Sequence, residues 1–177
     1  MIKAYPFFFR GTPLLIQIFL VYYGLSQIEW IRTSIFWVVL KDPVGCMVIA
    51  ISLNAGGYAA ELVRGALSNL PSGQLEAAQA LGFSRVRALF FIEIPQAYRF
   101  LIPSLSNEII FILKGSSLAS TITLMEVTGV TKTFIAKTFS PFEFFAFAGL
   151  AYFFIGTIFV KIFRRLDNKY NQTLDLG

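Results

Sequence analysis

Long uncharged stretches constrain this chain more than any other feature. Phe144–Val160 lies between Glu143 and Lys161 and is apolar on every face. A helix that is apolar all round is buried or spans a membrane, and roughly 20 such residues cross a hydrocarbon core of about 30 Å. We expect four membrane spans, at Gly11–Ile28, Pro43–Ala60, Ile102–Met125 and Phe144–Val160.

Composition excludes several other protein classes. Only 14% of residues are charged and 56% are hydrophobic, whereas soluble domains are about 25% charged. Histidine is absent and Cys46 is the single cysteine, which excludes an internal disulfide and argues against His-based catalysis or a metal site. We predict an all-α transmembrane bundle, one domain over residues 1–177, with no cofactor and no nucleic-acid partner.

Loop charges indicate how the chain crosses the membrane. The segment 64–99 and the tail from residue 161 are net positive, whereas the segments 25–42 and 126–143 are neutral. Positively charged loops remain cytoplasmic. The sequence therefore places the 64–99 segment and the C-terminus on the cytoplasmic side.

Residues 70–95 predict two short helices within that cytoplasmic loop. We expect Ser72 to cap the first helix and Gly82 to end it. Ser84 then caps a second helix that runs to about Ile94. From the residues alone, an ordinary helical loop is an equal alternative, because alanine-rich helices are common.

The spacing within this loop is more specific than its composition. Its distinctive positions are Glu76, Ala77, Ala78, Gly82, Ile92 and Pro95. The pattern resembles the EAA motif of ABC importer permeases, with Ile94 where that family usually has Leu. The resemblance implies that segment 70–95 is the coupling loop that docks on an ATP-binding subunit.

The resemblance covers nearly the whole chain, from about Phe9 to Arg165. Arg10–Gln17 looks like the RGTPLLVQ segment of the polar amino-acid subgroup, the histidine/arginine/glutamine-type permeases. Further matches follow in order at Asn54, Tyr58, Glu61, Arg64, Gly65, Ser106–Glu108, Lys114–Ala119 and Met125–Val127.

The resemblance implies a type I permease fold and a permease subunit in the inner membrane that imports polar amino acids. The sequence has no GxxxxGK[ST] phosphate loop, so ATP is expected to be hydrolysed by a separate subunit. A second permease subunit, identical or paralogous, and an external substrate-binding protein are further implied partners. Such permeases usually have a span before the segment that begins here at Arg10. We expect that span to be missing through an internal start, a fragment or a truncated gene.

Polar residues within the predicted spans are candidates for a substrate path, because intramembrane polar groups are costly and usually face a bundle interior or a water path. Asn54, Tyr58 and Glu61 share one helix face, and Arg64 is a local partner for Glu61. The alternative is that these groups form interhelical hydrogen bonds. The candidates are Gln17, Asn54, Tyr58, Lys114, Ser117 and Glu126.

The carboxylates of Glu126 and Glu61 favour a cationic amino acid such as arginine, histidine, lysine or an opine. Alternatively, Glu126 pairs with Lys132, and Lys114 could equally hold a substrate carboxylate. The Thr12-Pro13 step lacks a helix hydrogen bond and could bend during gating. Two other functions remain open: a self-sufficient channel or secondary carrier, and a non-functional truncated permease. A membrane enzyme is disfavoured by the absence of histidine.

Overall fold

The computed structural model describes residues 4–172, which contain helices and no strands. The elements are α1 (Ala4–Gly11), α2 (Leu14–Phe19), η1 (Leu20–Gly24), η2 (Leu25–Gln27), α3 (Glu29–Arg32), α4 (Trp37–Leu40), α5 (Pro43–Ser68), α6 (Ser72–Ala80), α7 (Arg85–Ala88), η3 (Leu89–Glu93), α8 (Ile94–Gly115), η4 (Ser116–Ile122), α9 (Val127–Thr138) and α10 (Pro141–Gln172).

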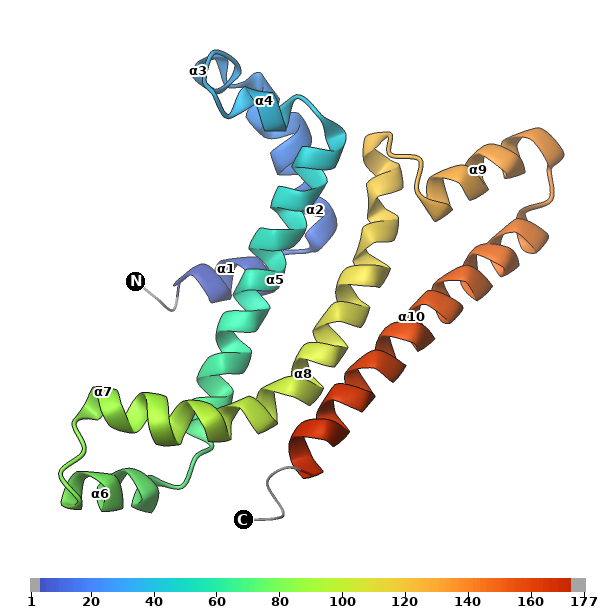
Figure 1. Cartoon of the computed structure of the whole chain (residues 1–177). Coiled ribbons are helices and arrows are strands. Elements are labelled where there is room, and N and C mark those ends of the chain that lie inside the picture. Colours follow the sequence, from blue (N-terminus) through green and yellow to red (C-terminus); the bar gives the residue numbers. More distant parts are fainter. Residues whose placement is uncertain (1–3, 173–177) are drawn as a thin grey trace.

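Three long helices, α5, α8 and α10, run side by side along the molecule, and α8 lies between the other two (Figure 1). Two segments, Pro43–Ser68 and Pro141–Arg165, are each long and apolar enough to cross a membrane. Two bent helix pairs raise the number of candidate spans to four. The predicted all-α transmembrane bundle is thus confirmed.

The first predicted span, Gly11–Ile28, is not one straight helix. The chain bends by 101° between α1 and the segment Leu14–Gln27. Pro13 has no N–H to donate to the carbonyl four residues earlier, which interrupts the helix. The straight part after Pro13 extends only about 20 Å at a rise of about 1.5 Å per residue, so it is shorter than a hydrocarbon core.

Helix α1 packs across α5 because α5 presents two glycines at the crossing. A Cβ added to Gly57 would lie 3.0 Å from the Cβ of Phe9, and one added to Gly56 would lie 2.7 Å from the Tyr5 hydroxyl. That hydroxyl also donates a 2.7 Å hydrogen bond to the carbonyl of Leu53. The close approach of α1 therefore depends on small residues, as is common between membrane helices.

The second short helix was expected to end at about Ile94, but in the structure it continues beyond that residue. The chain continues from α7 through a π-helical turn into α8, with Pro95 in the first turn of α8, where a missing N–H costs little. Figure 1 shows this helix turning from a course across the bundle to a course along it. Beyond Gly115 the predicted span 102–125 tightens into the 3₁₀ segment η4.

The largest buried cluster joins α2, α5 and η4, through Ile18, Met47, Ala50, Ala119 and Ile122. By contrast, only 6% of the apolar window of α10 is buried. The exposed face of α10 carries Phe147, Phe153 and Phe154. A helix so apolar and so exposed is suited to contact with lipid or another membrane helix.

Candidate functional site

The bend between α1 and α2 leaves two carbonyl groups without their usual helical partners. The carbonyl of Phe9 would normally accept from residue 13, which is proline. Nε2 of Gln17 donates to the Phe9 carbonyl at 2.9 Å and to the Thr12 carbonyl at 3.0 Å. Nδ2 of Asn54 donates to the same Phe9 carbonyl at 3.0 Å and to Oε1 of Gln17 at 3.1 Å. The two amides thus satisfy the carbonyls that the proline leaves free.

A cavity of about 490 Å³ lies against this bend, between α5 and α8. Asn54 and Tyr58 line it from α5, and Arg10 lines it from α1. Glu108 and Phe111 line it from α8. The cavity therefore holds one cationic and one anionic side chain, together with an amide and a phenol. We call it the bend cavity.

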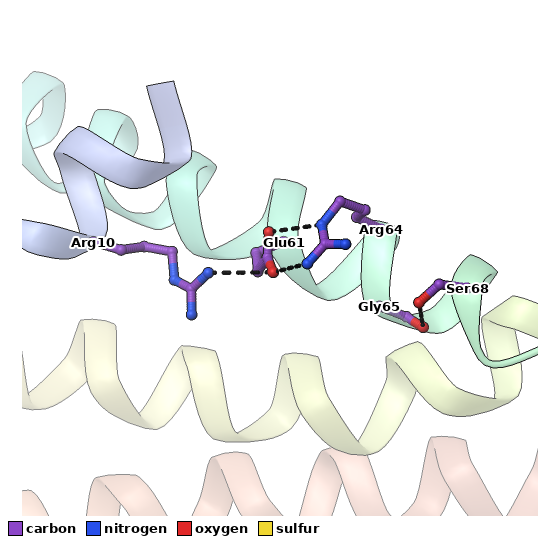
Figure 2. Close-up of polar contacts among 5 residues, drawn as sticks. All are labelled: Arg10, Glu61, Arg64, Gly65 and Ser68. Carbon is purple, nitrogen blue, oxygen red and sulfur yellow. Dashed lines mark hydrogen bonds and ion pairs between the residues drawn. The ribbon is translucent and has the colours of Figure 1, made fainter. Parts of the chain in front are cut away.

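Arg10 connects the bend cavity to an ion-pair cluster on α5 (Figure 2). Its Nη1 lies 3.5 Å from Oε1 of Glu61, and Arg64 pairs with the same carboxylate. The Arg64 contact, three residues along the helix, is the predicted local pair and is confirmed. The guanidinium of Arg10 also lies 5.5 Å from the ring centre of Tyr58. Sequence reasoning paired Glu61 only with Arg64, because Arg10 reaches it only through the bend.

The six predicted path residues do not converge on one site. Gln17 lies at the bend, and Asn54 and Tyr58 line the bend cavity. Lys114 and Ser117 line a cavity of about 300 Å³ between α8, α9 and α10. The two groups lie on opposite sides of α8.

Glu126 does not contact Lys132, the alternative partner considered from the sequence. It caps α9, and its carboxylate accepts hydrogen bonds from the backbone N–H groups of Thr128 at 2.8 Å and Gly129 at 2.9 Å. The hydroxyl of Tyr152 on α10 donates to Glu126 at 2.6 Å. Nζ of Lys132 donates instead to Ser120. Glu126 therefore joins α9 to α10.

The turn between α6 and α7 forms as the sequence predicts. Gly82 has a φ of +82°, a conformation that favours glycine. Its N–H donates to the carbonyl of Gln79 at 3.0 Å, and the N–H of Phe83 donates to the carbonyl of Ala78 at 3.0 Å. This pair of hydrogen bonds is the Schellman motif that ends helices. Ser84 caps α7 through its contact with the Arg87 N–H.

The start of α6 differs from the prediction. Pro71, rather than Ser72, occupies the N-cap position, and no side chain caps the helix. Ser72 is already helical because the fixed φ of Pro71 places the chain at the helix entry.

The residues of the EAA-like motif divide between the surface and the interior of the α6–α7 pair. Glu76 and Ala77 are exposed, as are Gly82 and Pro95. Ala78 is 2% exposed and Ala88 on α7 is 0% exposed. Ile92 is half-buried. Ala78 is therefore an interior residue of the motif, because its methyl group lies where the short helices pack together.

Sequence reasoning did not include Arg10 and Glu108 among the path residues. The helical period gives the relevant signal: residues 108, 111 and 112 share one face of α8, and residues 110, 113 and 114 share the opposite one. Nothing in the sequence indicates that Arg10 faces Glu108 across a cavity, because that depends on the bend.

Comparison with known proteins identifies the family. Residues 1–172 match the family described as the binding-protein-dependent transport system inner membrane component. The chain belongs to this family. The permease is 46% identical over 165 residues to the octopine transport system permease protein OccM of Rhizobium meliloti, covering 93% of this chain and 67% of that protein.

Other relatives agree with this assignment. The permease is 41% identical over 160 residues to the nopaline transport system permease protein NocM of Agrobacterium fabrum, covering 90% of this chain and 66% of that protein. It is 36% identical over 170 residues to the arginine ABC transporter permease protein ArtM of Escherichia coli, covering 96% of this chain and 76% of that protein. The permease thus spans about two thirds to three quarters of these relatives.

A solved structure has the same fold. The crystal structure of an amino acid ABC transporter with histidines matches with a TM-score of 0.81 and 31% identity, covering 94% of this chain and 73% of that chain. Together with the relatives, this match makes the chain a permease component of amino-acid ABC import in the membrane, with several helices that cross it.

Proposed function

We propose that this chain is the permease subunit that moves a cationic amino acid or opine across the inner membrane through the bend cavity. The observation that carries the proposal is the presence of Arg10 and Glu108 in one cavity. The compounds in the relatives' names (octopine, nopaline and arginine) all carry a guanidinium group. They also carry at least one carboxylate, so both charges have a counterpart in the cavity.

The chemistry of the cavity fits such a solute. A substrate carboxylate is attracted by the Arg10 guanidinium, and a substrate guanidinium by the Glu108 carboxylate, since charge-assisted hydrogen bonds are the stronger ones. Asn54 and Tyr58 supply additional polar groups. A volume of about 490 Å³ lies within the usual range for small-molecule sites of about 300–1,000 Å³.

The cationic preference is tested by Glu108→Gln in the importer reconstituted with its ATP-binding and substrate-binding subunits. We expect arginine uptake to fall at least about tenfold, the loss of one charged partner, while glutamine uptake changes less than twofold. Glu29→Gln, an exposed acid outside the cavity, is the matched control. Equal losses for both substrates would exclude a role for Glu108 in selectivity.

The α6–α7 pair is proposed to dock on the ATP-binding subunit. It lies at one end of the long helices (Figure 1). Exposed apolar side chains on and next to the pair include Leu81 in the turn, Val86 on α7, and Phe90 and Phe91 on η3. An exposed apolar patch marks an interaction surface. Glu76 lies on the exposed surface of α6. Hydrolysis of ATP is then a task of the partner, and the permease transmits the movement.

This docking is tested by co-purification of the permease with the ATP-binding subunit from membranes. Glu76→Lys is expected to reduce the recovered ATP-binding subunit severalfold and to abolish uptake. Glu143→Lys, an exposed acid at the start of α10, should change neither. Normal complex formation and normal uptake by Glu76→Lys would contradict the docking role.

The proposal includes two further partner proteins and an orientation of the chain in the membrane. A second permease subunit, identical or paralogous, completes the transport path, and an external binding protein delivers the substrate. The α6–α7 pair and the C-terminal end of α10 lie at the same end of the molecule in Figure 1, which supports a common cytoplasmic side. Lys114, Ser117 and Glu126 stay predictions for the path, separate from the bend cavity.

A further inference from the structure

A second large cavity, of about 590 Å³, lies between α8 and α10. We call it the α8–α10 groove. The residues that line it from α10 recur every three or four positions and form a single stripe: Gly149, Tyr152, Phe153, Gly156, Thr157, Val160, Lys161 and Arg164. On the α8 side, Ile110, Leu113 and Lys114 face this stripe. At a rise of about 1.5 Å per residue, the stripe is about 22 Å long.

The groove has a mostly apolar body and a cationic end. Lys161 and Arg164 lie one helical turn apart on the same face, toward the C-terminal end of α10, which is at the same end of the molecule as the α6–α7 pair (Figure 1). Gly149 and Gly156 deepen the groove: a Cβ at Gly149 would meet nothing within 4 Å, whereas one at Gly156 would touch Leu113 at 3.7 Å. Space is therefore available beside Gly149.

The charges of this groove differ from those of the bend cavity. Within residues 4–172, no acidic residue lines it, so these residues offer no counterpart to the ammonium group of an amino acid. Its cations match an anionic group instead, and its apolar body lies along a segment long and hydrophobic enough to cross the membrane. Basic pockets between membrane helices near the cytoplasmic surface suit anionic lipid headgroups.

We propose that the α8–α10 groove binds an anionic phospholipid. Its phosphate is held by Lys161 and Arg164, and one acyl chain lies along Ile110, Leu113 and Gly149. Arginine is well matched to phosphate through paired N–H donors. From Gly149 to Val160, before the cationic end, the stripe is about 16 Å long, which is close to the half-thickness of about 15 Å of a hydrocarbon core.

The test measures lipids retained by the full chain in native mass spectrometry, after exchange into detergent with equal amounts of dioleoyl phosphatidylglycerol and dioleoyl phosphatidylcholine. We expect preferential retention of phosphatidylglycerol. Lys161→Gln with Arg164→Gln should lower that retention about tenfold. The control pair Arg99→Gln with Arg165→Gln removes the same charge from exposed positions outside the groove and should lower it less than twofold. Equal losses in both pairs, or no loss, would overturn the proposal.

A second variant tests the apolar body of the groove without altering charge. Gly149→Leu fills the open space and should displace the phospholipid, whereas Gly65→Leu on α5, which also has open space, should not. Unchanged phosphatidylglycerol retention by Gly149→Leu would contradict the groove as the site. Thr157→Cys in a Cys46→Ala background tests another occupant: an efficient disulfide between two copies in membranes would mean that a second chain, rather than lipid, covers the groove.

Discussion

The side-chain amide of Asn54 on α5 donates a hydrogen bond to the side-chain carbonyl of Gln17 on α2, with an Nδ2–Oε1 distance of 3.1 Å. Gln17 is 4% exposed, so this contact lies within the packed bend. It links two helices through residues that are 37 positions apart in the sequence. The same amides satisfy the backbone carbonyls around Pro13. The sharp turn of the chain is therefore supported by side chains from two helices.

Asn54→Leu is expected to destabilise the bend. It removes the donor to the side-chain carbonyl of the buried Gln17 and one of two donors to the Phe9 carbonyl, and a buried polar group left unsatisfied costs about 1–3 kcal/mol. The measurement is the free energy of unfolding in mixed detergent and dodecyl sulfate micelles, followed by circular dichroism. Ser52→Ala, at an exposed position of the same helix, is the control. Unchanged stability with reduced uptake would show instead that Asn54 acts mainly on substrate.

Gly82→Ala is expected to loosen the turn between α6 and α7. A residue with a Cβ at a φ of +82° costs about 1–2 kcal/mol. Hydrogen exchange of the Phe83 amide, which bonds to Ala78, should accelerate about tenfold. Gly73 has open space around it and no positive φ, so the Gly73→Ala variant should retain the protection of the Phe83 amide. Equal exchange rates in both variants would disprove the role of the glycine.

Tyr152→Phe and Glu126→Gln are expected to weaken one and the same contact between α9 and α10. A hydrogen bond to a charged group contributes about 1.5–3 kcal/mol, and a double-mutant cycle on unfolding should show coupling between the two changes. Because the carboxylate caps α9, uptake of arginine and of glutamine should fall by the same factor. A selective loss of arginine uptake in Glu126→Gln would instead support the sequence-based prediction that Glu126 selects a cationic substrate.

Cysteines at Gln27 and Gly73, each in a Cys46→Ala background, should be labelled from opposite sides of the membrane. η2 and α6 lie at opposite ends of α5 (Figure 1), and the basic 64–99 segment favours the cytoplasm. A membrane-impermeant maleimide applied to intact spheroplasts measures this directly. Labelling of both positions from the same side would contradict the proposed topology.

The sequence by itself determined the membrane class, the α5 and α10 spans, the Gly82 turn and the Glu61–Arg64 pair. Each of these depends on local information: an uncharged stretch, a residue that tolerates positive φ, or a spacing of three along one helix. The EAA-like spacing likewise indicated the family, because it depends only on residues that are close together in the sequence.

Only the tertiary structure decided what the polar residues contact. Asn54 satisfies a carbonyl 45 residues away, Glu126 bonds to Tyr152 26 residues further on, and Arg10 shares a cavity with Glu108. The contacts of Asn54 and Arg10 depend on the 101° bend, and that of Glu126 depends on the packing of α9 against α10. Helical periodicity shows which residues share a face, whereas the angle and packing of the helices determine which face each one meets.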